Sequence, residues 1–221
     1  MATFSSTAAD RDTKISSSVA TRNFGASVTV LGAATTEAML IWWDLSSVAA
    51  GSTVNSATLT LYQAGSAAAN AFTLTVYNIL SGNSGWIEGT KNNATAGSGE
   101  PCWDAKAADG AGGVTTAWAG SAGLATSGTD YAATNIGTVG GNRSDANGTG
   151  YAISLNTTAV AAWLGNSANY GMKIVTSSGC GAIASAENAT AGWRPSLVID
   201  YTAAGGASVV PILMAQYRMR R

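Results

Sequence analysis

Two segments of this chain alternate between apolar and hydroxyl-bearing side chains. They span residues 57–62 and 72–77, and threonine or tyrosine occupies the positions between the apolar residues. The apolar positions are Ala57, Leu59, Leu61, Phe72, Leu74 and Val76. A two-residue period places successive side chains on opposite faces of a β-strand. Each segment therefore predicts a strand with one face toward an apolar core. We expect the two strands to form a hairpin or to be near neighbours.

Similar patterns recur along the chain, whose 221 residues suit one large β domain. Further strands are expected around Val28 and Val30 and over residues 39–45, 151–155, 170–176, 181–185 and 196–201. Short polar connections separate most of them. We therefore predict an all-β fold, a two-sheet jelly-roll sandwich of about eight or nine strands. Only residues 157–164 suggest a helix, with Asn156 or Thr157 as its N-cap and Gly165 at its end.

The composition argues against nucleic acid as a binding partner and against a membrane-spanning helix. Charged residues make up 10% of the chain, against about 25% in an average soluble protein. The net charge is -1, so no basic surface for nucleic acid is expected. The amino terminus lacks the basic and apolar regions of a signal peptide, and no run of about 18 apolar residues predicts a membrane span.

One connection is long. Residues 81–147 are rich in glycine, alanine, asparagine and serine but also contain Trp86, Trp103, Trp118 and Tyr131. Such large aromatic side chains predict an ordered excursion that packs on the sandwich. Two interpretations of these rings stay open. They are either core residues, which is the usual fate of tryptophan, or flat surfaces on which sugar rings stack.

The carboxyl-terminal segment, residues 203–221, has a different character. A linker rich in glycine and alanine leads to an apolar and basic tail, from which we expect docking on a partner surface. The candidate docking residues are Ile212, Leu213, Met214, Tyr217, Arg218, Arg220 and Arg221. We accordingly predict two units, a domain over residues 1–202 and the tail over residues 203–221, with self-association or binding to a shell or appendage protein.

Catalytic chemistry finds little support in the sequence. The chain has no histidine, which excludes histidine-activated nucleophiles and histidine metal ligands. Glu88, Glu100, Asp104 and Asp109 lie in the excursion, but their spacing does not predict the paired carboxylates of a glycosidase. No catalytic residue and no organic cofactor is predicted.

Two smaller features leave alternatives open. Asp10 and Asp12 lie two residues apart before a predicted strand, so they either hold a structural Ca²⁺ ion or cap backbone amides in a turn. Cys102 and Cys180 are far apart in sequence. They form one disulfide if their Cα atoms lie within about 7 Å, and otherwise they remain two free thiols.

Several motifs together resemble one family. The segment 9–62 contains DRDT, RNFG and MLIWWDLSS; residues 85–93 read GWIEGTKNN; and residues 183–201 read IASAENATAGWRPSLVIDY. With NYGMKIVTSSG at residues 169–179, they resemble the DNRLRE domain over about residues 8–202. The resemblance implies a jelly-roll sandwich of the carbohydrate-binding-module type, found in surface and secreted bacterial proteins, without catalytic residues.

Two functions follow as expectations. The first is a non-catalytic structural protein of a virion, such as a head decoration or an appendage, or of another extracellular surface, held by its tail. The second is a carbohydrate-binding module that recognises a polysaccharide through the excursion. The resemblance favours the second, but the apolar and basic tail favours the first, which is the function that we expect from the sequence, with the second as the alternative.

Overall fold

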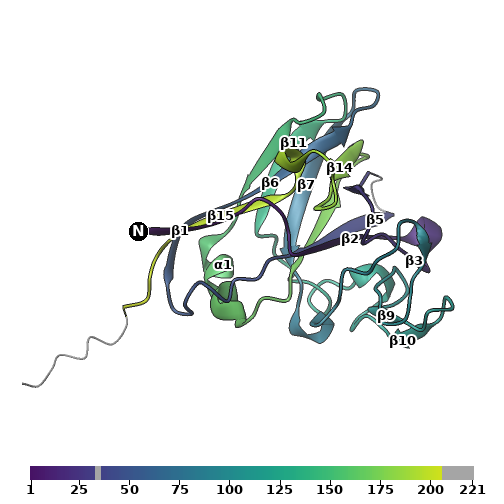
Figure 1. The fold of residues 1–221 in the computed structure, drawn as a ribbon, viewed down its shortest axis with the longest axis horizontal. Coiled ribbons are helices and arrows are strands. Elements are labelled where there is room, and N and C mark those ends of the chain that lie inside the picture. Colours follow the sequence, from purple (N-terminus) through teal and green to yellow (C-terminus); the bar gives the residue numbers. More distant parts are fainter. Residues whose placement is uncertain (33–35, 206–221) are drawn as a thin grey trace, which may run out of the picture.

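A computed structural model describes residues 1–32 and 36–205, and these residues form an all-β sandwich (Figure 1). The first sheet has the order β1-β15-β6-β14-β4, with β12 also paired to β6. The second has the order β11-β7-β13-β5-β2. All the pairings between these strands are antiparallel. The predicted all-β sandwich is therefore confirmed, whereas the jelly-roll topology stays a prediction.

The strands have the following bounds. The first sheet contains β1 (Ala2–Ser6), β4 (Thr29–Leu31), β6 (Thr53–Gly65), β12 (Gly150–Ser154), β14 (Ala182–Ala184) and β15 (Ser196–Thr202). The second contains β2 (Arg11–Ser16), β5 (Glu37–Trp42), β7 (Ala71–Asn78), β11 (Gly137–Asn142) and β13 (Met172–Thr176). Two small ribbons pair β3 (Arg22–Asn23) with β8 (Ala94–Thr95) and β9 (Ala107–Ala108) with β10 (Val114–Thr116).

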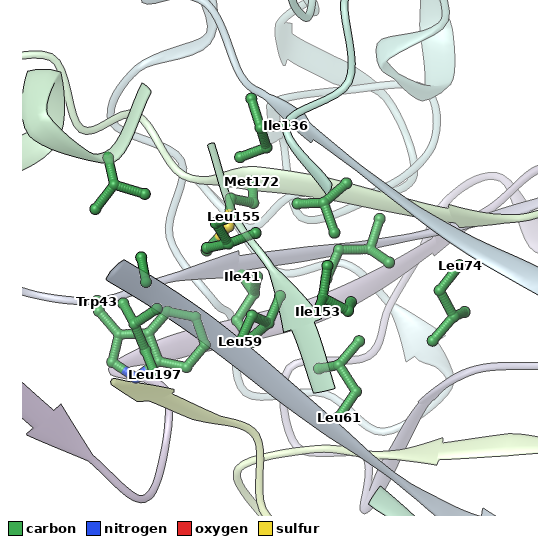
Figure 2. Packing of buried hydrophobic residues seen from close by; sticks show 14 of the residues in the cluster. Ile41, Trp43, Leu59, Leu61, Leu74, Ile136, Ile153, Leu155, Met172 and Leu197 are labelled. Atoms are coloured by element: carbon green, nitrogen blue, oxygen red, sulfur yellow. The ribbon is translucent and has the colours of Figure 1, made fainter. Parts of the chain in front are cut away.

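The main core lies between the two sheets, where the alternating strands bury their apolar faces. Figure 2 shows Leu59 and Leu61 of β6 close to Ile153 of β12, with Ile41 of β5 and Met172 of β13 in the same cluster. All five side chains are at most 3% exposed. Burial of each such side chain contributes about 1.5–3 kcal/mol, which makes this core the main source of stability.

The hairpin expected as one alternative for the first two strands is wrong. β6 and β7 belong to opposite sheets, and residues 66–70 cross from one to the other. Leu59 and Leu74 are both fully buried, as the alternation predicts, but in facing layers of one core. Alternation specifies which face of a strand is apolar and carries no information about its hydrogen-bonded neighbour.

The predicted helix is confirmed as α1 (Thr157–Trp163). The Asn156 side chain caps it by accepting a hydrogen bond from the Ala159 backbone N–H at 3.0 Å. Short 3₁₀ helices occur at η1 (Ser17–Val19), η2 (Ser81–Asn83), η3 (Ala122–Leu124), η4 (Leu164–Asn166) and η5 (Ala191–Trp193). In the described part of the chain, no helix is long and apolar enough to cross a membrane.

The excursion covers the outer face of the second sheet. The part that lies outside the two main sheets is residues 81–136, because β11 occupies residues 137–142 of the predicted connection. At the lower right of Figure 1 it surrounds β9 and β10 beside β2 and β5. Strand β5 is buried over Ala38–Ile41, so both of its faces are apolar. Leu40 belongs to a second core with Trp86, Trp118 and Leu124 of the excursion.

The strand count is higher than expected, since the two sheets contain six and five strands among the described residues. β1 has a mixed sequence, ATFSS, and β11 is rich in glycine, GTVGGN, so neither carries a strong periodic signal. Both are edge strands. Their pairing with β15 and β7 places them in the sheets despite their weak local preference.

Candidate functional site

A pocket of about 320 Å³ lies between the second sheet and the excursion. From the sheet, β5 provides Glu37 and Ala38, and β13 provides Lys173, Val175 and Thr176. Opposite them, the excursion provides Trp103, Gly123 and Ala125. The pocket thus combines an indole ring with a carboxylate, an ammonium and a hydroxyl group. Its volume is at the lower end of the range of about 300–1,000 Å³ that is typical of small-molecule sites.

Gly123 allows the Trp103 ring to lie where it does. Gly123 has a φ of 76°, and a Cβ atom at this position would clash with the six-membered ring of Trp103. The Gly123 N–H also donates to the Trp103 carbonyl at 2.6 Å. Only glycine adopts this backbone conformation with so close a neighbour at little cost. Trp103 itself remains half-buried, so part of its surface stays accessible from the pocket.

Lys173 forms the polar wall of the pocket. Its Nζ donates to the Leu124 carbonyl at 2.6 Å and lies 4.2 Å from the centre of the Tyr131 ring. Burial lowers the pKa of Lys173 to about 8, although the nearby Asp130 carboxylate opposes the shift. An ammonium group has three N–H donors. Lys173 is therefore held in place by the excursion and retains donor capacity near the pocket.

The four aromatic residues predicted to contact a ligand have different environments in the structure. Trp86 and Trp118 are 2% and 4% exposed and belong to the second core, so neither presents a ring face to a ligand. The stacking interpretation is therefore corrected to the core interpretation for these two residues. Tyr131 is half-buried and packs edge-on against Tyr77 and beneath the Lys173 ammonium. Of the four, Trp103 alone lines the pocket.

Asp10 and Asp12 do not form a site together. Asp10 is exposed, and its Oδ2 accepts a hydrogen bond from the backbone N–H of Asp44, which is 34 residues away and outside the turn of Asp10, at 2.7 Å. Asp12 lies inside β2 and is completely buried. Its carboxylate lies instead near Glu88 and Glu187, and one oxygen from each of the three lies within 4.8 Å of the others.

The sequence predicted only part of this three-carboxylate cluster. Glu88 belongs to the acids of the excursion, whereas Glu187 lies 99 residues farther along the chain, so local sequence does not predict that they are close. The motifs that carry the DNRLRE resemblance do contain all three acids, in DRDT, GWIEGT and AENAT. Burial raises the pKa of Asp12 well above its usual value, and the neighbouring carboxylates raise it further.

The remaining acids of the excursion support its backbone. Glu100 is buried and accepts from the N–H groups of Thr90 and Gly97, both at 2.7 Å. Asp109 accepts from the N–H of Ala111 at 2.7 Å within an exposed turn. The structure therefore gives both carboxylates a role in loop geometry.

Cys102 and Cys180 form no disulfide. Both are free and buried, Cys180 in the main core and Cys102 in a small cluster of excursion residues. Burial raises the pKa of the Cys180 thiol to about 12, which leaves it protonated and unreactive at neutral pH. The predicted docking residues of the tail lie outside the described part of the chain.

No family model matches the sequence, and no curated protein matches it either.

Proposed function

We propose that this chain is a non-catalytic module that binds one sugar unit of a glycan in the pocket beside Trp103. The observation that carries the proposal is the combination of an accessible indole with polar groups of different kinds in one small pocket. A pyranose ring has an apolar face that packs on an aromatic ring, and hydroxyl groups at its edge that bind carboxylates, ammonium groups and hydroxyls. Glu37, Lys173 and Thr176 provide these three partners.

Two further observations support binding without catalysis. The chain has no histidine. Among the closely spaced acids Asp12, Glu88 and Glu187, Asp12 is completely buried. A buried carboxylate cannot reach a polysaccharide. The resemblance to the DNRLRE domain supports the same assignment.

Replacement of Trp103 by alanine is the direct test. The full-length protein is screened on a glycan array, and the best ligand is then titrated by calorimetry. Because aromatic packing contributes about 0.5–1.5 kcal/mol beyond the buried area, we expect Trp103→Ala to weaken binding by about tenfold or more. Trp103→Tyr should retain most of the affinity.

Val114→Thr is the matched control, because Val114 is 49% exposed in β10 and does not line the pocket. It should bind like the wild type. Circular dichroism must show that each variant is folded. Glycan binding that is unchanged in Trp103→Ala would place the site elsewhere, and the absence of any glycan ligand would reject the proposed function.

A second candidate is a structural role on a virion or another extracellular surface. It is favoured by the sequence of the tail, in which an apolar segment is followed by Arg218, Arg220 and Arg221. Such a segment suits docking between copies of the chain or on an acidic shell protein. The two candidates are compatible, since a surface protein can also hold glycans.

Light scattering of the full-length chain beside a chain ending at Thr202 tests this second role. We expect the full-length protein to form defined oligomers and the shortened protein to be monomeric, because the docking residues are removed. Oligomers of equal size from both proteins would rule out docking through the tail. Monomers from both would reject self-assembly.

A further inference from the structure

We propose that Asp12, Glu88 and Glu187 form a calcium-binding site that joins β2 to the excursion and to the loop between β14 and η5. This site is separate from the Trp103 pocket, and it does not depend on glycan binding. Its three ligands come from three distant parts of the sequence. A bound ion would therefore connect the outer strand of the second sheet to the segments on either side of it.

The spacing of the oxygen atoms suits calcium. One carboxylate oxygen from each residue lies within 4.8 Å of the other two. Calcium binds oxygen at about 2.3–2.6 Å, so two ligands of one ion are at most about 5 Å apart. The site needs little movement to close around an ion of this size.

Unpartnered oxygen atoms supply the second, independent observation. Asp12 is completely buried, and its Oδ1 has no hydrogen-bond partner among the described residues. Glu187 Oε2 is likewise buried without a partner in the described part of the chain. Buried polar atoms almost always have a partner, because leaving one without costs about 1–3 kcal/mol. Two such oxygen atoms in one cluster point to a ligand that binds them both.

The other contacts hold the cluster in position. Asp12 Oδ2 accepts from the Ala186 N–H at 2.7 Å, which fixes the loop that carries Glu187. Glu88 Oε1 accepts from the Asp12 N–H at 2.6 Å, which fixes the excursion against β2. These backbone bonds orient the three side chains before any ion arrives. Such preorganisation lowers the cost of binding.

The charge of the cluster is not balanced by neighbouring ion pairs. None of its three carboxylates forms an ion pair with a basic side chain of the described residues. Arg11 and Arg194 are the nearby cations that act on Glu88 and Glu187, but their guanidinium groups donate to the carbonyls of Trp86 and Asn188. A divalent cation would compensate the excess negative charge.

The pKa values of the cluster agree with this assignment. Burial raises the pKa of Glu88 to about 7, with a further rise from Glu187 and opposing effects from the Asp12 N–H and Arg11. The pKa of Asp12 and that of Glu187 are also raised, in both cases chiefly by burial.

The donor set favours calcium over other metals. All the side-chain ligands are carboxylates, whereas zinc and copper prefer sites that include histidine or cysteine. Magnesium demands regular octahedral geometry and keeps several waters, which suits a buried cluster of three protein ligands less well.

Thermal unfolding of the full-length protein tests the site. The protein is stripped with a chelator, dialysed, and melted with and without CaCl₂ at pH 8. We expect calcium at 100 times its dissociation constant to raise the melting temperature by about 5–10 °C. MgCl₂ should give a smaller shift than CaCl₂.

Glu187→Gln and Asp10→Asn form the matched pair of variants. Glu187→Gln should lose most of the calcium-dependent shift, because it removes one ligand charge at a half-buried position. Asp10→Asn should keep the full shift, because its amide oxygen still accepts from Asp44. Calorimetric titration with CaCl₂ provides a second readout. No calcium binding at pH 8 would overturn the proposal, as would a full shift in Glu187→Gln or a preference for zinc.

Discussion

Replacing Trp86 by alanine is expected to lower the free energy of unfolding by about 3–5 kcal/mol, which is a large part of the total stability of a typical domain. Trp86 is 2% exposed in the second core, and its Nε1–H donates to the Tyr170 carbonyl at 3.0 Å. The substitution creates a cavity and leaves that carbonyl without its partner. Urea unfolding followed by circular dichroism measures the loss.

Trp103→Ala is the internal control for this effect. Trp103 is half-buried and only borders the second core, so its removal should cost clearly less than the removal of Trp86. A loss below about 1 kcal/mol for Trp86→Ala would mean that the excursion contributes little to global stability. In that case the excursion would unfold before the sandwich, and hydrogen exchange would show early loss of protection over residues 81–136.

Removal of the Asp130 side chain is expected to have the second largest effect. Asp130 is completely buried, and its carboxylate accepts from the Asn83 side chain and from the N–H groups of Gly120, Ser121 and Thr126 at 2.7–3.1 Å. Asp130→Ala leaves these donors without an acceptor. We expect a loss of about 3 kcal/mol or more, measured by urea unfolding at pH 7.

The pH dependence of this effect follows from the same contacts. Burial by itself would raise the pKa of Asp130, but the hydrogen bonds from Asn83 and from the three backbone amides outweigh it and lower the pKa. The carboxylate therefore contributes stability above its unfolded pKa of about 3.9, and this contribution is lost as the pH falls through the folded value.

Asp130→Asn keeps the shape of the side chain but removes its charge and replaces one acceptor oxygen by an NH₂ donor that faces N–H groups. Its stability relative to the wild type should be lowest at pH 7, and the difference should shrink at pH 3, where the Asp130 carboxyl group of the unfolded wild-type chain, with a pKa of about 3.9, is largely protonated. A difference that is constant between pH 7 and pH 3 would show that geometry, and not the charge, holds the loop between residues 119 and 131.

Local sequence predicted more of the fold than of the candidate site. Periodicity predicted the strands that line the main core and the short helix after Asn156, because both signals depend on residues a few positions apart. It did not predict β1 or β11, whose sequences have little preference of their own. These two strands are ordered by pairing with β15 and β7.

For the glycan pocket, the sequence predicted only a set of candidate aromatic residues. The order of the excursion followed from its aromatic content, since such rings need burial. Which ring remained accessible did not follow, because the residues that flank each tryptophan in the sequence do not show which rings reach the sheet. The answer depends on β5, whose outer face is apolar at Ala38 and Leu40 and therefore binds the rings that reach it.

The sequence by itself determined which side chains avoid water, and hence the class of the fold. Only the tertiary structure showed that β6 and β7 lie in opposite sheets. It also showed that the carboxylates of Asp12, Glu88 and Glu187 lie close together. The physical reason is the range of each interaction. The tendency of a side chain toward burial is a property of that residue and its near neighbours in the sequence. The assignment of strands to sheets and the contact between distant carboxylates depend instead on the fold of the whole chain.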